Sequence, residues 1–343
     1  MTRFISDVYI REDITITKNC ITHKLQVVCL SVATLLLEGC AGFFVNTTTT
    51  GSTTSTSSSS SVDYVYVANA NNGDSGSIAV YSLASSALTA ITGSPFSVSY
   101  SPTTLAVRPG NDFLFAGSST TGGIYAYAIS STGALTAENS GDAVASVYPV
   151  AMDIDAAGSY LVALLNDYLT VVTYAINTST GALTQTSSAT ATTGSLTGWV
   201  KLLPDEDYAY VSTGTGGISI FTFDSSTGTI VNTGSHLAGS STVSYQQVVV
   251  DTTSTYLAAV RVGTNAGVDE HTLSSGAIES GTVYTTGGVP SAVSFGPSNE
   301  AVYVANRDKN TVAEFSFSAG TLTALSTSTI ATGSVPIAVL MDS

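Results

Sequence analysis

The chain has 343 residues, of which 43% are hydrophobic and only 10% charged, so it is too apolar to be disordered throughout and long enough to bury a sizeable core. Residues 62–343 account for the whole net charge of −15, because the residues before them hold four basic and four acidic side chains. A domain this acidic repels phosphate backbones, which argues against nucleic acid as a partner.

An apolar run of 13 residues, "LQVVCLSVATLLL", occupies positions 25–37. It is too short to span a bilayer comfortably and has the length of a signal-peptide core. The run ends in "LEGC" (37–40), which resembles the lipobox of bacterial lipoproteins, with Cys40 as the acceptor of the lipid. We predict that residues 1–40 form an export signal and that a lipid on Cys40 is the protein's one membrane attachment, on the periplasmic or surface side of a bacterial cell envelope. Cleavage by ordinary signal peptidase, followed by release, is the alternative.

Residues 41–61 contain a Thr/Ser-rich stretch, "NTTTTGSTTSTSSSSS" (46–61). The stretch has no apolar group to bury, so it is expected to be a flexible linker. The chain's three cysteines all precede residue 41, so no disulfide is possible within residues 62–343.

A unit repeats six times from residue 62 onward. Its clearest marker is a turn followed by a short strand, which recurs every 44 to 48 residues: "SALT" (86–89), "GALT" (133–136), "GALT" (181–184), "GTIV" (228–231), "GAIE" (276–279) and "GTLT" (320–323). A period of this size is typical of β-propellers and solenoids.

Two further strands recur in each unit, and both alternate β-branched or aromatic residues with smaller ones. The first is led by an aromatic residue in five of the six units: "YVYVAN" (64–69), "FLFAGS" (113–118), "YLVALL" (160–165), "YAYVST" (208–213), "YLAAVR" (256–261) and "AVYVAN" (301–306). The second comprises "IAVYSL" (78–83), "IYAYAI" (124–129), "VVTYAI" (171–176), "ISIFTF" (218–223), "VDEHTL" (268–273) and "VAEFSF" (312–317).

A fourth strand precedes the aromatic-led strand in five units, and its sixth copy ends the chain. The copies are "PTTLAVRP" (102–109), "PVAMDIDA" (149–156), "TGWVKLLP" (197–204), "YQQVVVDT" (245–252), "PSAVSFGP" (290–297) and "PIAVLMDS" (336–343). The last copy lacks a following strand, and the first aromatic-led strand lacks a preceding one. We therefore predict an all-β propeller of six four-stranded blades over residues 62–343, closed by pairing of the C-terminal strand with the N-terminal blade.

With "YVYVAN", "AVYVAN" and the "GALT" turns, the sequence resembles the bacterial propeller family of 6-phosphogluconolactonase-like lactonases and Tyr-Val-Thr-Asn repeat surface proteins. The resemblance covers residues 62–343 and implies a propeller that is usually seven-bladed. It also implies lactone hydrolysis by His, Glu and Arg residues around the channel. No motif transfers any of those roles to an individual residue of this chain.

Residues 62–343 hold two histidines and show no pattern of a catalytic or metal site. His271 stands where the other five units have Tyr or Phe, which indicates a core aromatic replaced by imidazole, and His236 falls in a loop-like stretch. There is no HExxH, CxxC or G-x-S-x-G motif, so we expect no metal and no cofactor. The "GTGG" at 214–217 indicates a hairpin turn and not a phosphate loop.

The channel rim offers the best candidates for ligand binding. The second strands end in polar residues, among them Asn69, Arg261 and Asn306, and Arg307 follows the last of these. A guanidinium binds carboxylate or phosphate through two parallel hydrogen bonds, so Arg261 and Arg307 are candidates for holding a small acidic ligand. The alternative is that each pairs with a neighbouring acid such as Glu270 or Asp308.

The innermost strands place three further residues at the channel. Asp153 and Lys201 fall at the same level of adjacent blades, where they form an ion pair or polarise a bound substrate. Trp199 lies on the same strand as Lys201 and is either a core residue or a platform for stacking a sugar ring.

These observations favour an exported, lipid-anchored propeller that acts as a binding or scaffold module and is not an enzyme. Its expected partners are a cell-envelope protein, a carbohydrate or a small acidic ligand, and we expect a monomer. A lactonase of the 6-phosphogluconolactonase type is the alternative.

Overall fold

The structure is a computed structural model. It describes residues 43–46, 63–70, 75–84, 87–192, 194, 198–204, 207–296, 298–332, 335, 336 and 339. The predicted export signal, with Cys40, lies outside these residues.

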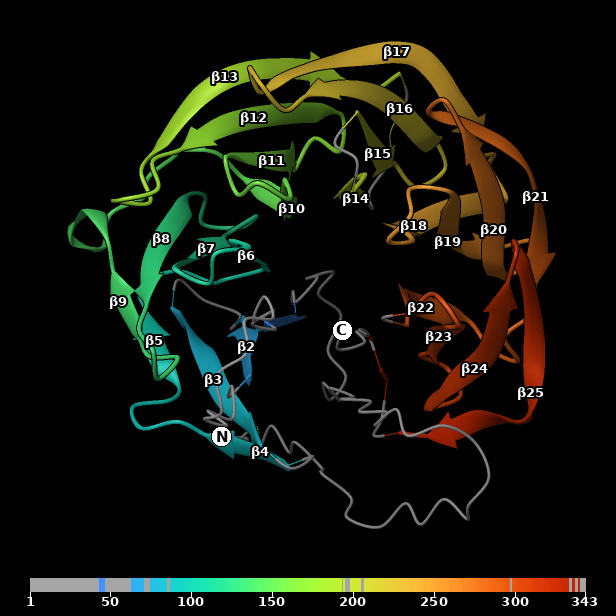
Figure 1. The fold of residues 1–343 in the computed structure, drawn as a ribbon, viewed down its shortest axis with the longest axis horizontal. Coiled ribbons are helices and arrows are strands. Elements are labelled where there is room, and N and C mark those ends of the chain that lie inside the picture. The colour runs from blue at the N-terminus through green and yellow to red at the C-terminus, as the bar shows by residue number, and fades with distance from the viewer. Residues whose placement is uncertain are drawn as a thin grey trace, which may run out of the picture.

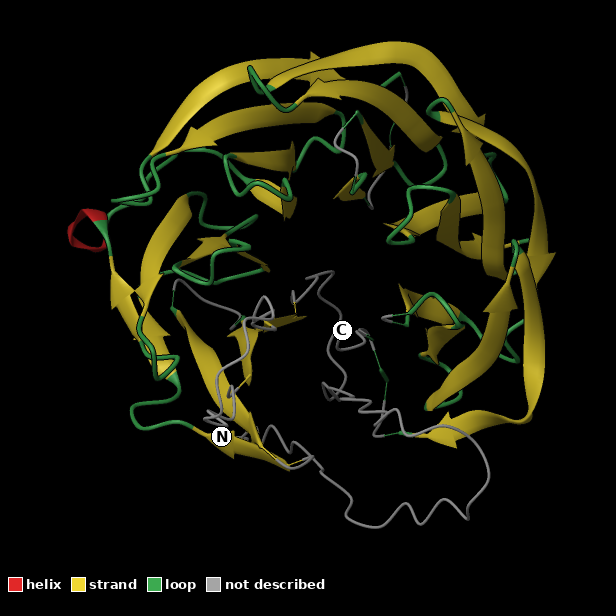
Figure 2. Cartoon of the chain, in the orientation of Figure 1, coloured by secondary structure: helices red, strands yellow, loops and turns green. Residues whose placement is uncertain are grey.

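Six antiparallel sheets follow one another around a central axis in chain order, with blades 1 and 6 at the two ends of the arc (Figure 1). In blades 2 to 6 the strand order is the chain order, from the innermost to the outermost strand. The prediction of an all-β propeller with six four-stranded blades is confirmed. Figure 2 shows that strands dominate the described chain, whose one helical element is the short 3-10 turn η1 (Asn139–Gly141).

The strands of blades 1 to 3 have the following bounds: β1 (Phe43–Asn46), β2 (Asp63–Asn69), β3 (Gly76–Ala84), β4 (Ala87–Ala90) and β5 (Phe96–Val98); β6 (Thr104–Val107), β7 (Phe113–Gly117), β8 (Ile124–Ile129) and β9 (Leu135–Ala137); β10 (Pro149–Ile154), β11 (Tyr160–Leu165), β12 (Thr170–Ile176) and β13 (Leu183–Thr190). In blade 1, β5 pairs with β3 as an extra strand.

The strands of blades 4 to 6 have the following bounds: β14 (Trp199–Leu202), β15 (Tyr208–Ser212), β16 (Gly217–Asp224) and β17 (Thr229–Ala238); β18 (Val243–Val250), β19 (Tyr256–Gly263), β20 (Gly267–Ser274) and β21 (Ala277–Tyr284); β22 (Pro290–Phe295), β23 (Ala301–Asn306), β24 (Thr311–Ser318) and β25 (Thr321–Ala331).

The cores lie between blades, because both faces of each inner strand are apolar. Five clusters of buried side chains join blades 1 and 2, 2 and 3, 3 and 4, 4 and 5, and 5 and 6. Each fully buried Val, Leu, Ile or Phe in such a cluster contributes roughly 1.5 to 3 kcal/mol of transfer free energy.

An aromatic residue of each of the first five blades sits on a glycine of the following blade. This glycine is the first residue of the turn that recurs in each unit, and its φ is positive. A Cβ added to it would lie only 2.2 to 2.9 Å from the nearest atom of the aromatic ring. The pairs are Tyr64 on Gly133, Phe113 on Gly181, Tyr160 on Gly228, Tyr208 on Gly276, and Tyr256 on Gly320. The "GALT" turn therefore contains glycine for two physical reasons, backbone conformation and contact with the next ring.

The sequence departs from this pattern at the positions that would join blade 6 to blade 1. Blade 6 begins its second strand with Ala301 instead of an aromatic residue, and position 86, equivalent to the turn glycine, is serine. Among the described residues, Val65, Val67 and Ala79 of blade 1 form a cluster separate from the cluster of blade 6 that contains Val339.

The edge of β2 is paired with β1, in a register that sets Phe43 against Val67 and Asn46 against Tyr64. This is the edge to which the sequence assigned the C-terminal strand, and β1 lies in the segment assigned to the linker. An exposed strand edge presents unpaired N–H and C=O groups that an extended segment can pair with, and here β1 does so. Of residues 336–343, Pro336 and Val339 are described, and the Ser291 hydroxyl donates to the carbonyl of Pro336 at 2.6 Å.

Candidate functional site

The innermost strands begin, and the second strands end, at the same mouth of the channel, since the two are antiparallel neighbours. Arg261 lies near the end of β19 at this mouth, with Tyr245 of β18 on one side and Gly267 of β20 on the other. The polar strand ends predicted from the sequence therefore gather at one mouth because of strand direction alone.

Arg261 belongs to a polar network between blades 4 and 5 that is centred on Asp269. Its Nη1 lies 3.2 Å from Asp269 Oδ2, to which the Tyr245 hydroxyl also donates at 2.6 Å. His271 Nε2 lies 3.0 Å from the other carboxylate oxygen, Oδ1. The side chain of Asp269 is only 5% exposed, so two hydrogen-bond donors and the nearby imidazole offset its removal from water.

His271 is held by a hydrogen bond at one ring nitrogen and lies close to a carboxylate at the other. Its Nδ1 donates to the carbonyl oxygen of Glu279 at 2.8 Å, and its Nε2 faces Asp269. A carbonyl and a carboxylate both accept, so the arrangement favours an imidazolium with two N–H donors. Neither nitrogen is left to take a proton from a ligand, which fits the interpretation of His271 as a replaced core aromatic.

The charges in this network stabilise one another. Burial opposes ionisation of Asp269, but hydrogen bonds from His271 and Tyr245 outweigh it and lower the pKa of Asp269. Burial likewise opposes the charged form of His271, and the Asp269 carboxylate overcomes it and raises the pKa of His271. With Arg261 and His271 cationic and Asp269 anionic, the network has one excess positive charge in an acidic domain.

Glu270 points to the opposite face of β20, toward blade 6. Its Oε1 lies close to Gly320 of blade 6, 3.4 Å from the point that a Cβ on this glycine would occupy. No described residue donates a hydrogen bond to that oxygen. Burial raises the pKa of Glu270 to about 7, with the nearby Asp269 charge adding to the effect and His271 opposing it. Arg261 therefore pairs with Asp269 and not with Glu270.

The other rim residues are separate from this network. Arg307 is exposed and forms no ion pair with any described residue, and Asp308 pairs with Lys309 at 3.7 Å. Asn306 is buried, and its side-chain amide exchanges two hydrogen bonds with Thr286, at 2.6 and 2.8 Å. Asn69 donates to the Ser77 hydroxyl at 3.2 Å.

Asp153 and Lys201 form an ion pair between the innermost strands of blades 3 and 4. Lys201 Nζ and the backbone N–H of Leu202 both donate to Asp153 Oδ2, at 2.9 and 2.8 Å. Their side chains are 33% and 17% exposed for Lys201 and Asp153, so the pair remains in contact with solvent. Trp199 is half-buried and packs against the clusters on both sides of blade 4, which makes it a packing residue.

Sequence reasoning missed Asp269 and Tyr245. The signal was present in "VDEHTL", the one copy of this strand in which two acids and a histidine follow one another, at positions that most other units fill with aliphatic or aromatic residues. A buried run of that kind predicts a compensating network even when its partners cannot be named.

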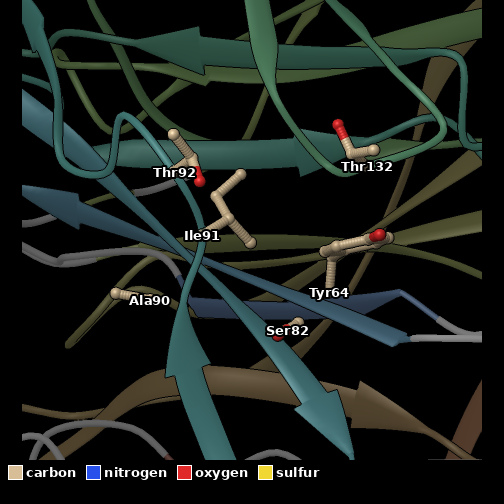
Figure 3. A pocket seen from close by; sticks show the side chains of 6 residues that line it. All are labelled: Tyr64, Ser82, Ala90, Ile91, Thr92 and Thr132. Carbon is tan, nitrogen blue, oxygen red and sulfur yellow. The ribbon is translucent and has the colours of Figure 1, made fainter.

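Other kinds of site are not evident in the described part of the chain. No group of His, Cys, Asp and Glu there has the geometry of a metal site, and no helix there has the length and apolarity needed to cross a bilayer. A hollow of about 450 Å³ lies away from the mouth, beside blade 1. Uncharged side chains line it, with Tyr64 and Thr132 on one side and Ile91 and Thr92 on the other (Figure 3).

Comparison with known proteins finds one matching family profile and several solved structures with a similar fold. The profile of the family described as lactonase, 7-bladed β-propeller matches residues 64–163. No curated protein sequence matches the chain. The family match confirms the resemblance drawn from the repeat motifs over residues 64–163, and the described chain has six blades.

Several solved structures share the propeller fold. A protein from Lactobacillus plantarum is 17% identical, with a TM-score of 0.66 over 80% of this chain and 84% of that one. The periplasmic gluconolactonase of Pseudomonas aeruginosa is 17% identical, with a TM-score of 0.64 over 82% and 85%. A candidate 6-phosphogluconolactonase of Bacteroides fragilis is 17% identical, with a TM-score of 0.65 over 82% and 84%. At these identities the likeness concerns the fold, because one propeller framework serves many functions.

Proposed function

We propose that this protein is an exported, lipid-anchored propeller of the bacterial cell envelope that binds a small anionic ligand, such as a sugar acid, at the mouth of blade 5. The observation that carries the proposal is the fixation of Arg261 by Asp269 and by the carbonyl of Thr264. A guanidinium held in one orientation loses little conformational entropy when it binds a carboxylate.

The environment of Arg261 favours an anion. Its side chain is 18% exposed, so part of the guanidinium faces solvent while one edge is held by the carboxylate. The imidazolium of His271 compensates the Asp269 charge, which leaves the charge of Arg261 available to a ligand. Against a net charge of −15, this is a local attraction and not a field that steers anions from a distance.

Export and anchoring are supported by the sequence alone. The 13-residue apolar run and the lipobox-like "LEGC" precede the propeller, and residues 62–343 contain no cysteine. Metabolic labelling with a palmitate analogue tests the anchor, because a Cys40→Ala variant should lose the label. Label that persists in the variant contradicts the anchor.

Calorimetric titration with gluconate and glucuronate tests the anion site. Arg261→Gln should weaken binding by about tenfold or more, since hydrogen bonds to a charged group are worth roughly 1.5 to 3 kcal/mol. Arg307→Gln is the matched control, because Arg307 is an exposed cation outside the network, and it should leave affinity within about twofold. Equal loss in the two variants, or no binding to the unmodified protein, contradicts the proposal.

Lactone hydrolysis is the second candidate, favoured by the family match over residues 64–163 and by the Asp153–Lys201 pair at the channel. In such a reaction a water oxygen bonds to the lactone carbonyl carbon and the ring C–O bond breaks. Asp153 would accept the water proton and return it to the ring oxygen, while the Lys201 ammonium stabilises the oxyanion.

Assays with 6-phosphogluconolactone and unphosphorylated aldonolactones separate the two candidates. If the protein is a lactonase, Asp153→Asn should reduce kcat by at least about 100-fold, and Lys309→Ala should leave it unchanged. Absence of hydrolysis above background in the folded protein leaves the binding function alone.

A further inference from the structure

A second feature of the same mouth lies in blade 3 and does not involve Arg261. Tyr148, just before β10, is 46% exposed and is one of three large hydrophobic residues with substantial exposure in the described chain. The other two, Val231 and Leu325, lie on the outer strands β17 and β25.

The Tyr148 ring rests on Gly122, and the neighbouring Gly123 lies against a second tyrosine ring, that of Tyr125. A Cβ on Gly122 would lie 3.0 Å from Cε1 and Cζ of the ring, and one on Gly123 would lie 2.7 Å from the Tyr125 ring. Gly122 and Gly123 have φ values of 81° and 101°, a backbone conformation that residues with a side chain rarely adopt. Both the backbone conformation and the close ring contacts therefore require glycine at these positions. Each glycine thus allows close approach of a different tyrosine.

Tyr125 belongs to a second, more deeply buried pair of rings. Tyr125 lies parallel to Tyr100, with ring centroids 3.7 Å apart and an interplanar angle of 4°. Tyr100 is 2% exposed, and its hydroxyl lies 2.9 Å from that of Tyr127. The stacked pair of Tyr100 and Tyr125 and the exposed ring of Tyr148 therefore contact the adjacent glycines Gly123 and Gly122.

The backbone of Tyr148 is fixed on both sides. The N–H of Gly123 donates to the carbonyl of Val147 at 2.5 Å, and the N–H of Asn166 donates to the carbonyl of Tyr148 at 2.8 Å. The second bond joins Tyr148 to the β11–β12 turn, where the Asp167 carboxylate accepts the N–H groups of Leu169 and Thr170 at 3.0 and 2.8 Å. An exposed aromatic side chain on a fixed backbone loses little entropy when a flat ligand covers it.

We propose that Tyr148 is a stacking platform for a neutral sugar ring of a glycan. A pyranose presents a face of C–H groups that can cover an aromatic ring, while its hydroxyls remain available to polar groups at the edge. The adjacent loop supplies such groups, with hydroxyls of Ser118 and Thr121 bonded to each other at 2.7 Å.

The charge of the site selects against other flat ligands. Nucleotides carry phosphates, which the net charge of −15 repels. An acidic sugar is disfavoured by Asp167, whose own burial is outweighed by hydrogen bonds from Thr170 and Leu169 that lower its pKa and keep it ionised. The platform therefore differs in ligand class from the anion site at Arg261.

Titration with neutral oligosaccharides tests the platform. The probes are cellohexaose, maltohexaose, xylohexaose and mannohexaose. Each is titrated by calorimetry to a sugar concentration of about 10 mM, which is high enough to detect a Kd in the millimolar range. At least one probe should bind, and Tyr148→Ala should weaken it by about tenfold or more, comparable with the loss of one aromatic stacking contact. Tyr148→Phe should stay within about threefold, because the ring and not the hydroxyl makes the contact.

Val231→Ala is the matched control, since it removes an exposed apolar side chain from an outer strand. It should leave binding of the neutral sugar unchanged. The proposal is overturned if no probe binds, or if Tyr148→Ala binds as well as the unmodified protein. It is also overturned if sedimentation shows self-association that Tyr148→Ala abolishes while no sugar binds, because Tyr148 is then a protein contact.

Discussion

Blades 2 and 5 fill the same position of the propeller in opposite ways. The third strand of blade 2 places Tyr125, Ala126 and Tyr127 where that of blade 5 places Asp269, Glu270 and His271. Blade 2 uses stacked rings and a hydroxyl contact, all of them uncharged. Blade 5 uses two carboxylates, an imidazolium and a guanidinium.

The difference shows that the third strand of a blade can carry either buried aromatic rings or buried ions, and that the two differ in the free energy of burial. Aromatic rings gain free energy simply by leaving water, whereas buried ions lose hydration and regain it only through well-placed partners. The charged solution occurs where Arg261 has to be held at the channel mouth. Blade 5 therefore combines a core that requires desolvation of ions with an oriented cation. Blade 2 combines an uncharged aromatic core with an exposed tyrosine platform beside it.

Removing the centre of the charged core should have the largest effect. Asp269→Ala leaves Arg261 and the buried His271 without their acceptor, so we expect a loss of about 3 to 5 kcal/mol in the free energy of unfolding. Urea denaturation monitored by Trp199 fluorescence measures it. Asp308→Ala, which removes an exposed carboxylate that pairs with Lys309 and accepts the N–H of Val289, should have a much smaller effect. A similar small cost for both variants would mean that the blade 5 network contributes little to stability.

The two blades should also differ in their response to pH. The raised pKa of Glu270, about 7, means that stability falls as pH rises from its unfolded value of 4.5 through about 7. Stability from His271 is complete below 6.5 and is lost as pH rises through its raised pKa. Stability from Asp269 is present above 3.8 and is lost as pH falls through its lowered pKa. The protein should therefore be most stable in mildly acidic solution.

Glu270→Gln isolates one part of this pH dependence. The variant cannot ionise, so it should be more stable than the unmodified protein at pH 8 by roughly 1 to 3 kcal/mol and nearly equal to it at pH 4.5. Thermal unfolding at the two pH values measures the difference. An equal shift at both values would show that Glu270 acts through packing and not through its charge.

The smallest effect is expected in blade 2. Tyr100→Phe removes one partner of the contact with Tyr127 and should cost about 1 kcal/mol at every pH, because the remaining buried hydroxyl loses its partner. The double variant Tyr100→Phe/Tyr127→Phe should recover part of that cost. A pH-dependent loss in the single variant would undermine the contrast between the two blades.

The repeat allowed most of the fold to be predicted from the sequence. Alternation and a regular period determine strands, and the equivalent third strands of blades 2 and 5 were aligned by the sequence alone. The pairing of β1 with β2 was not predictable, since a four-residue extended segment beside a Ser/Thr-rich stretch has no periodic signal. The other strands could be recognised because they recur in each unit, whereas β1 has no equivalent in the other units.

The candidate site was only partly predictable. Arg261 could be found because polar strand ends meet at one mouth, and the level of Asp153 and Lys201 followed from the alignment of inner strands. The partner of Arg261 could not be chosen between Asp269 and Glu270, because strand alternation puts these two acids on opposite faces but the sequence does not give the register that sets Arg261 opposite Gly267. Tyr148 precedes an inner strand, and nothing in its sequence neighbourhood marks it as exposed.

The aromatic-on-glycine contact has a consequence for how such a protein can change over evolutionary time. Each unit contributes the ring for one junction and the glycine for another, as Tyr160 and Gly181 do for blade 3. A gene segment encoding one whole unit can therefore be duplicated or deleted, and the newly adjacent units still match. Blade number can vary between relatives without redesign of any interior junction, and the changes then concentrate at the ends, where this chain has Ala301 and Ser86.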